Sequence, residues 1–308
     1  MTAYVVRRLL WLPVLLVIVI FITFVLGTYG PGDPVEVRLG TKANPEAVAR
    51  LRTQMGLDRP FVVQFADYVG GVVRGDFGDS YRYQGRTVLE LILPRMWVSA
   101  QLNLAALLLV VAIGIPLGMA AARFQGRWLD PAIVTGIVFI SSLPVLITGP
   151  LFLLVFVVLL KLVPSAGWGG LFDTRIIIPA VAIAVPGLAL IVRVMRTSTL
   201  EVLSQDYVRT AYAKGLTPGI ISRRHVARNA FLPVLTMLGF SVAGLIGGTI
   251  IGETIFGIPG IGRLAFESIF NRDYPVIMGI TIIGAATFVL ANLLIDVAYT
   301  FLDPRIRY

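Results

Sequence analysis

The chain contains no cysteine, a single histidine and few charged residues. Only 14% of its 308 residues are charged and 57% are hydrophobic, whereas a soluble domain carries roughly a quarter charged residues. Without cysteine, the chain can form neither a disulfide nor a thiolate metal site. His225 lies in a basic segment outside any H-E-x-x-H pattern, so a surface position is the simpler interpretation, with catalysis or metal binding as the alternative. These deficits argue against a soluble enzyme and favour a protein built for lipid.

Six apolar runs are long enough to cross a bilayer, because a helix needs about 20 residues to span a hydrocarbon core of roughly 30 Å. The third run contains Pro144 and Pro150, so a kinked or broken span is expected there. The first run follows Arg7 and Arg8 without a small-x-small cleavage site, which indicates an uncleaved span. The pattern predicts an all-α, polytopic membrane protein with six transmembrane helices at residues 9–28, 97–122, 132–160, 176–195, 233–252 and 276–301.

The formal net charge of +9 is better explained by a cytoplasmic face and anionic lipid than by nucleic acid, because basic residues mark the cytoplasmic loops of membrane proteins. With the N-terminus inside, the short outside loops hold only Lys161, Arg175, Arg263 and Arg272. The first outside loop is longer than about 60 residues and escapes this rule. The distribution predicts that both termini and segment 196–232 are cytoplasmic. The inside segments hold the larger basic set: Arg7, Arg8, Arg123, Arg127, Arg193, Arg196, Arg209, Lys214, Arg223, Arg224, Arg228, Arg305 and Arg307.

The predicted domains are a first transmembrane helix at 1–28, an external helical cap at 29–96, and a core at 97–308 with the other five helices. In the cap, Asn44-Pro45-Glu46 is typical of a helix start, and Gly56 of a helix end. A second helix is expected after Asp58-Arg59-Pro60, followed by a turn at 74–78. The cap is either a structural lid or a docking surface. The second helix has an apolar face formed by Phe61, Phe65, Tyr68, Val69 and Val72.

The third outside loop, Glu253–Pro275, is too apolar for a loop in water and is expected to fold back into the protein. Glycine and proline predict tight turns in its first half, and Arg263–Phe270 can form two helical turns. We expect this loop to form an external gate, at the mouth of a path or against a partner. The candidate gate residues are Phe256, Gly257, Pro259, Gly260, Arg263 and Phe266.

Few residues are candidates for a catalytic, nucleotide-binding or metal-binding site. The run from Gly247 to Thr254 imitates a phosphate loop, but Glu253 replaces the lysine that meets the phosphates. Gly244, Gly248 and Gly252 recur every four residues and predict a small-residue face for close helix packing. Asp296 lies inside the last span, where structural pairing and a substrate role are both open. The sequence contains no Ser/His/Asp set and no pair of catalytic carboxylates, so we expect no covalent chemistry and no metal site.

Segment Tyr207–Pro233 reads YVRTAYAKGLTPGIISRRHVARNAFLP. Ala211 and Gly215 match the general E-A-A-x3-G pattern of bacterial ABC importer permeases, whereas Arg209, Thr210, His225 and Arg228 depart from it. The departures, together with PGDPVE, RGDFGDSYR, ETIFGIPGIGR and RDYPV elsewhere, resemble the first permease subunit of the dipeptide/oligopeptide permease subgroup. Members of this subgroup carry peptides, nickel, glutathione or sugars, so the resemblance leaves the cargo open.

The resemblance implies a type I ABC importer permease in the cell membrane that works by alternating access. Its implied partners are a homologous second permease, two ATPase subunits that bind ATP and Mg²⁺, an external solute-binding protein and membrane lipid. Ala211 and Gly215 are expected to share one helix face for close approach to an ATPase, unless the loop only touches lipid headgroups. The alternative is an ion-gradient-driven carrier or channel, with Asp296 as its acid. The implied coupling residues are Arg209, Thr210, Ala211, Tyr212, Lys214 and Gly215.

Overall fold

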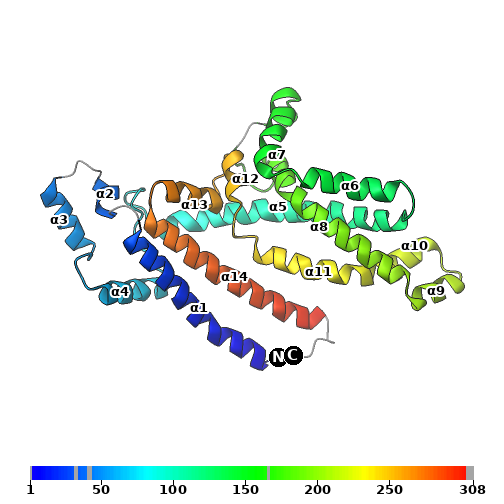
Figure 1. The fold of residues 1–308 in the computed structure, drawn as a ribbon, viewed down its shortest axis with the longest axis horizontal. Coiled ribbons are helices and arrows are strands. Elements are labelled where there is room, and N and C mark those ends of the chain that lie inside the picture. The colour runs from blue at the N-terminus through cyan, green and yellow to red at the C-terminus, as the bar shows by residue number, and fades with distance from the viewer. Residues whose placement is uncertain (1, 31–33, 40–43, 165–166, 303–308) are drawn as a thin grey trace. The chain divides into compact units, whose positions relative to one another are not determined.

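The computed structural model describes residues 2–30, 34–39, 44–164 and 167–302, and within these ranges the chain is almost entirely helical (Figure 1). The only strand-like pairing in these ranges is an isolated bridge between Asp79 and Thr87. The predicted all-α class is therefore confirmed. The helices form two compact units, one of Met1–Ser99, Ile246–Ile250 and Pro259–Tyr308, and one of Ala100–Leu245 and Ile251–Ile258.

Five helical stretches in the described residues are long and apolar enough to cross a membrane, and one bent pair of helices gives a sixth span when it is counted as one. The predicted six-span fold is confirmed with the bent pair counted as one span. The side chain of Asp296, in the last helix, lies outside the described residues. The spanning helices are α1 (Thr2–Tyr29), α5 (Val88–Arg123), α8 (Ile177–Leu203, after the 3-10 turn η2, Thr174–Ile176), α11 (Ala227–Ala243, continuous with the turns from Pro218) and α14 (Tyr274–Leu302).

The third span is broken, as its prolines predict. Helix α6 (Leu129–Ser141) ends before Pro144, and α7 (Val145–Phe152) continues into the π-helix η1 (Leu153–Leu159) at an angle of 94° to α6. A proline disfavours helical backbone in the residue before it, so Leu143 and Pro144 separate the two helices. The bend lies at the first of the two prolines, and Pro150 is accommodated inside α7.

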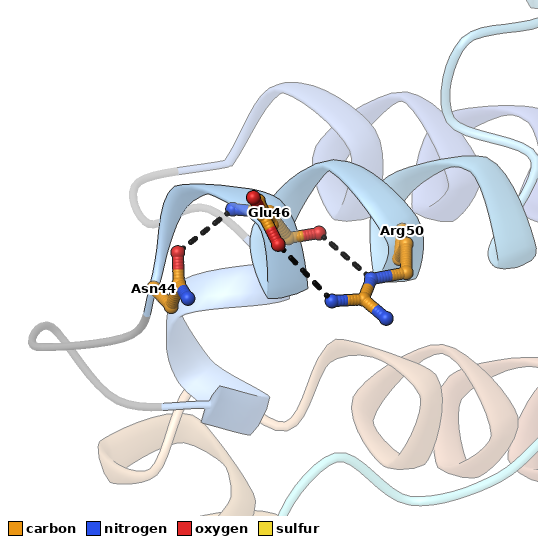
Figure 2. A network of polar contacts seen from close by, with 3 residues as sticks. All are labelled: Asn44, Glu46 and Arg50. Carbon is orange, nitrogen blue, oxygen red and sulfur yellow. Dashed lines mark hydrogen bonds and ion pairs between the residues drawn. The ribbon is translucent and has the colours of Figure 1, made fainter.

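The expected helix start at Asn44 is present in the first unit, which also contains the short helix α2 (Pro34–Leu39). The Asn44 side chain accepts a hydrogen bond from the backbone N–H of Glu46 at 3.1 Å, and Glu46 pairs with Arg50 one turn later (Figure 2). Helix α3 runs over Pro45–Gln54, and Gly56 follows in the left-handed region at φ +68°. Asn44 and Gly56 therefore set the two ends of this helix, as predicted.

The second cap helix, α4 (Phe61–Val73), packs on α1 through aromatic rings. The Phe61 and Phe65 rings lie 5.5 and 5.6 Å from the Phe24 ring, and Phe65 lies 5.5 Å from Phe21. Tyr68 meets Phe24 at 5.4 Å. The predicted apolar face of this helix is therefore the face that is covered. The same unit contains the pair α1 and α14, which lie side by side (Figure 1).

Helix α8 lies at the centre of the second unit and contacts α6, α7 and α11. A methyl group at Gly114 would lie 2.9 Å from the Ile191 side chain, and one at Gly118 would lie 2.6 Å from Met195 and 2.8 Å from the Val192 carbonyl oxygen. Two glycines four residues apart therefore let α5 approach α8 closely, which is how small residues act between membrane helices.

Two predictions about the fifth span are wrong. The helix runs from Pro218 to Ala243 rather than over 233–252, because Pro233 lies inside the helix and the glycine-rich run after Ala243 ends it. Gly244 follows the last turn, Gly248 has φ +69°, and Gly252 belongs to the separate helix α12 (Ile250–Ile255). These glycines therefore form no common helix face, and the close packing occurs at Gly114 and Gly118 instead.

Candidate functional site

The basic segment 196–232 is folded rather than extended. Helix α8 continues to Leu203, and the short helix α9 (Asp206–Ala213) follows. The chain then turns through α10 (Pro218–Ile220) and the π-helix η3 (Ile221–Val226) into α11. The expected short helix is present, and it stands at the end of two long helices of the second unit (Figure 1).

Helix α9 has clear start and stop signals. Asp206 stands in its first turn, where a carboxylate stabilises the positive end of the helix dipole. Gly215 follows the helix at φ +74°, and the Leu216 N–H bonds back to the Ala211 carbonyl. This left-handed closure is the usual role of glycine after a helix. Gly215 therefore ends α9 and does not share a helix face with Ala211, contrary to the prediction from their spacing.

Ala211 is buried in a small core that belongs to this segment. It is 5% exposed and packs with Val208, Ile221 and Val226, which are 0–1% exposed. The small side chain of Ala211 therefore allows α9 to approach η3 of the same chain. The prediction that Ala211 presents a bare surface to a partner is wrong for this structure, because the residue is covered by its own loop.

The outer side of α9 and its flanking turns carries aromatic and basic side chains. Tyr207 is 44% exposed, Tyr212 is 50% exposed and Ile220 is 46% exposed. Arg209, Thr210, Lys214 and Gly215 are exposed as well. Arg209 reaches Asp206 at 3.5 Å, but both side chains are open to water, so this pair contributes little stability. We call these seven residues the α9 surface.

Asn229 and Tyr207 hold α9 against the start of α11. The Asn229 side-chain amide donates to the Tyr207 hydroxyl at 2.8 Å and to the His225 carbonyl at 3.0 Å. His225 is half-buried within η3, and the described residues contain no group of three or more metal-binding side chains. These contacts hold α9 and η3 together between the two long helices α8 and α11. We call residues 206–226 the elbow.

Asp130 and Arg196 form an ion pair that the sequence did not reveal. Asp130 stands in the first turn of α6, and Arg196 lies in α8, so the pair joins two helices of the second unit. Both carboxylate oxygens are engaged by the guanidinium, each at 2.6 Å. Such a bidentate contact fixes the orientation of the two side chains as well as their distance. The only sequence signal is an isolated acid at the start of an apolar run.

The candidate gate residues fall into both units. In the second unit, Phe256 follows α12, is fully buried and packs near Gly149 of α7, while Gly257 turns the chain at φ +66°. Phe256 is therefore not available to a partner in this structure. The expectation that the apolar part of the loop folds into the protein is confirmed by the burial of Phe256, Ile258 and Leu264.

In the first unit, Pro259 and Gly260 lead into α13 (Ile261–Phe270). The Ile261 N–H donates to the Ser99 hydroxyl at 2.8 Å, which fixes the start of this helix. Arg263 pairs with Glu267 at 2.8 Å, and Phe266 is 39% exposed beside Phe270. Of the predicted gate residues, Pro259 and Phe266 are exposed, whereas Gly260 is buried.

Two family descriptions match most of this chain. The sequence model of the binding-protein-dependent transport system inner membrane component matches residues 114–308, and that of its N-terminal region matches residues 1–96. A probable peptide ABC transporter permease of Sinorhizobium fredii is 38% identical, with 100% of both chains covered. The dipeptide transport system permease of Bacillus subtilis is also 38% identical, over 100% of this chain and 98% of the relative. The glutathione transport system permease of Salmonella typhimurium is 37% identical, with 100% of both covered.

The fold resembles that of a solved transporter. Two inward-facing crystal forms of the MetNI methionine ABC transporter match 69% of this chain and 94% of theirs, with TM-scores of 0.53 and 0.55 at 17% identity. At that identity the likeness supports the fold alone, and the sequence matches carry the family. The chain belongs to the family of binding-protein-dependent transport system inner membrane components.

Proposed function

We propose that the chain is one permease subunit of an ATP-driven importer of di- or oligopeptides. The relatives named as peptide, dipeptide and glutathione permeases support this cargo class, because they match along the whole chain. A homologous second permease completes the membrane path, and a binding protein delivers the peptide from outside. The chain itself performs no covalent chemistry, and ATP with Mg²⁺ is bound and hydrolysed by two partner ATPase subunits.

The proposed orientation places both termini and segment 196–232 in the cytoplasm, and segment 29–96 forms an external cap. The distribution of lysine and arginine supports this topology. The α9 surface then faces the compartment where ATP is available. The face of α13 with Arg263 and Phe266 is then external, where it would meet the binding protein or border the path.

The observation that carries the proposal is the α9 surface. Exposed aromatic side chains and arginines, such as Tyr212 and Arg209, are enriched at protein interfaces relative to the rest of the surface. A complementary groove on the ATPase would have apolar walls and an acidic rim. Arg209 and Lys214 would meet the rim, and Tyr207, Tyr212 and Ile220 the walls.

Movement of the ATPases would be transmitted to the membrane helices through the elbow. The buried core of Val208, Ala211 and Val226 joins α9 to η3, and the hydrogen bond from Asn229 to Tyr207 joins α9 to α11. Arg196 extends the connection from α8 to α6 through its pair with Asp130. A displacement of α9 would therefore shift several membrane helices together, which is what alternating access requires.

A transport assay with matched variants tests this function. The assembled importer, reconstituted in vesicles with its binding protein, should take up a dipeptide when ATP is present. Tyr212→Ala with Lys214→Ala should reduce uptake by 10-fold or more, because loss of about 1.4 kcal/mol of docking energy already weakens binding tenfold. Gln125→Ala, an exposed polar position in the α5–α6 turn, should leave uptake unchanged. Full uptake by the double variant would exclude α9 as the docking helix.

A further inference from the structure

A basic cavity of about 420 Å³ lies in the second unit, apart from the α9 surface. Its walls are the end of α5, the α5–α6 turn and the first turn of η3. The polar lining consists of Arg123, Arg127 and Ser222, and the apolar lining includes Pro116, Met119 and Phe124. The Arg127 guanidinium lies over the Phe124 ring at 6.0 Å. The cavity thus combines two cations with a hydrocarbon wall.

The two arginines have no counter-charge within the part of the chain that the structure describes. Among the described residues, neither Arg123 nor Arg127 forms an ion pair. The nearest acid in the sequence, Asp130, is occupied on both oxygens by Arg196. Two like charges around one cavity repel each other, and an anion between them would remove that repulsion.

The surroundings indicate what kind of anion fits. Arg123 is the last residue of α5, a helix long and apolar enough to cross a membrane. With α5 spanning a bilayer, the cavity would lie where hydrocarbon gives way to headgroups. Trp128, directly after Arg127, is 75% exposed, and exposed tryptophan is typical of that boundary. A free inorganic anion would have no use for the apolar wall, whereas a lipid would place its chain there.

We propose that this cavity binds an anionic phospholipid, with the headgroup phosphate between Arg123 and Arg127 and an acyl chain along Pro116, Met119 and Phe124. The Ser222 hydroxyl offers a further hydrogen bond to the phosphate from the segment that carries α9. Basic pockets between transmembrane helices are known to hold anionic headgroups. The bound lipid would link the α5–α6 turn to η3 and so stiffen the elbow. This inference depends on the membrane placement of α5 and not on the docking of an ATPase.

Native mass spectrometry of the full-length chain in detergent, titrated with phosphatidylglycerol, tests the inference. Arg123→Gln with Arg127→Gln should weaken lipid retention about 25-fold, since each basic residue near an anionic surface contributes about fivefold. The control Arg223→Gln with Arg224→Gln removes the same charge from exposed positions in η3 that do not line the cavity. It should retain the lipid like the unchanged chain. Equal losses in both variants would reveal only general surface charge and overturn the proposal.

Three further measurements distinguish a bound lipid from a free phosphate and from an acidic side chain of a partner. Phe124→Ala should lower retention of phosphatidylglycerol without any change in charge. Water-soluble glycerol phosphate should not displace the lipid at equal concentration; full displacement would mean that the site recognises a free phosphate. The same measurement on the assembled transporter should show the lipid still bound. Loss of the lipid on assembly would mean that an acidic side chain of the partner fills the cavity, and would contradict a lipid site.

Discussion

The Ser80 hydroxyl donates a hydrogen bond to the Asp273 carboxylate across 193 residues of sequence. Both residues are fully buried in the first unit. The same carboxylate accepts the backbone N–H groups of Tyr81 at 3.0 Å and Arg82 at 3.3 Å. Asp273 immediately precedes α14, so its side chain ties the loop after α4 to the start of the last membrane helix.

Removal of this carboxylate should destabilise the protein. Asp273→Ala leaves up to three donors without their acceptor, at roughly 1–3 kcal/mol for each buried donor, so we expect a loss of about 3 kcal/mol or more. The measurement is thermal unfolding of the purified chain in detergent. Asp79→Asn, at an exposed position nearby, is the control and should leave the midpoint unchanged. An unchanged midpoint for Asp273→Ala would exclude the carboxylate as the tie.

Because Asp130 and Arg196 form an ion pair, substitutions of the two residues should have non-additive effects on the free energy of unfolding. Arg196→Met alone leaves a buried carboxylate without its cation and should cost about 3–5 kcal/mol. Asp130→Leu combined with Arg196→Met removes both charges and should recover most of that loss, because apolar replacements of buried pairs are often neutral. Denaturant unfolding of the two single variants and the double variant gives the coupling energy. Strictly additive effects would mean that the two side chains do not interact.

At Gly118, even the addition of a methyl group should destabilise the protein. A methyl group there would lie 2.8 Å from the Val192 carbonyl oxygen, which is backbone and cannot rotate away. Gly118→Ala should therefore separate α5 from α8 and destabilise the second unit by about 1–3 kcal/mol, the usual range for overpacking. Gly136→Ala in α6 is a matched control because its methyl group meets no atom within 4 Å. The control should be neutral or slightly stabilising, and equal unfolding midpoints for both variants would contradict close packing.

The Tyr68 hydroxyl predicts a loss of stability at alkaline pH. It is buried and has no hydrogen-bond partner within the described residues. Burial, and secondly the nearby Tyr81, raises the pKa of Tyr68 above the usual value of about 10. The unfolded chain therefore loses this proton more easily, so the stabilisation is complete below about pH 10 and falls as pH rises further.

Tyr68→Phe should remove this pH dependence. It should also raise stability by about 1 kcal/mol at neutral pH, because it deletes a buried donor that bonds to nothing. Unfolding measured between about pH 8 and pH 11 distinguishes the variant from the unchanged chain. Parallel stability curves for the unchanged chain and the Tyr68→Phe variant would show that this phenol does not contribute to the alkaline loss.

Local signals in the sequence predicted the fold well where they act over a few residues. Asn44 and Gly56 set the ends of α3, and Pro144 marks the break in the third span. The apolar face of α4 could be read from its helical period. Prediction failed for the fifth span, which was expected to begin at residue 233. Pro233 instead lies inside the helix, because a membrane helix can contain a proline.

The contacts that join distant segments could not be predicted. The spacing of Ala211 and Gly215 suggested one helix face, but the left-handed turn at Gly215 ends the helix between them. Asp130 and Asp273 are single acids whose partners, Arg196 and Ser80, lie 66 and 193 residues away. No periodic pattern connects such residues, because their pairing depends on the packing of whole helices.

Site-directed crosslinking tests the central claim, that α9 of this chain contacts the ATPase. The chain has no cysteine, so Tyr212→Cys and, separately, Lys214→Cys each introduce one reactive group on the α9 surface. In the assembled importer, both should crosslink to an ATPase subunit with a short bifunctional reagent, and ATP should change the yield. Val208→Cys, fully buried in the core that α9 forms with η3, should not react. Failure of both surface positions to crosslink in an assembly that transports peptide, or an equal yield from Val208→Cys, would contradict the proposed docking.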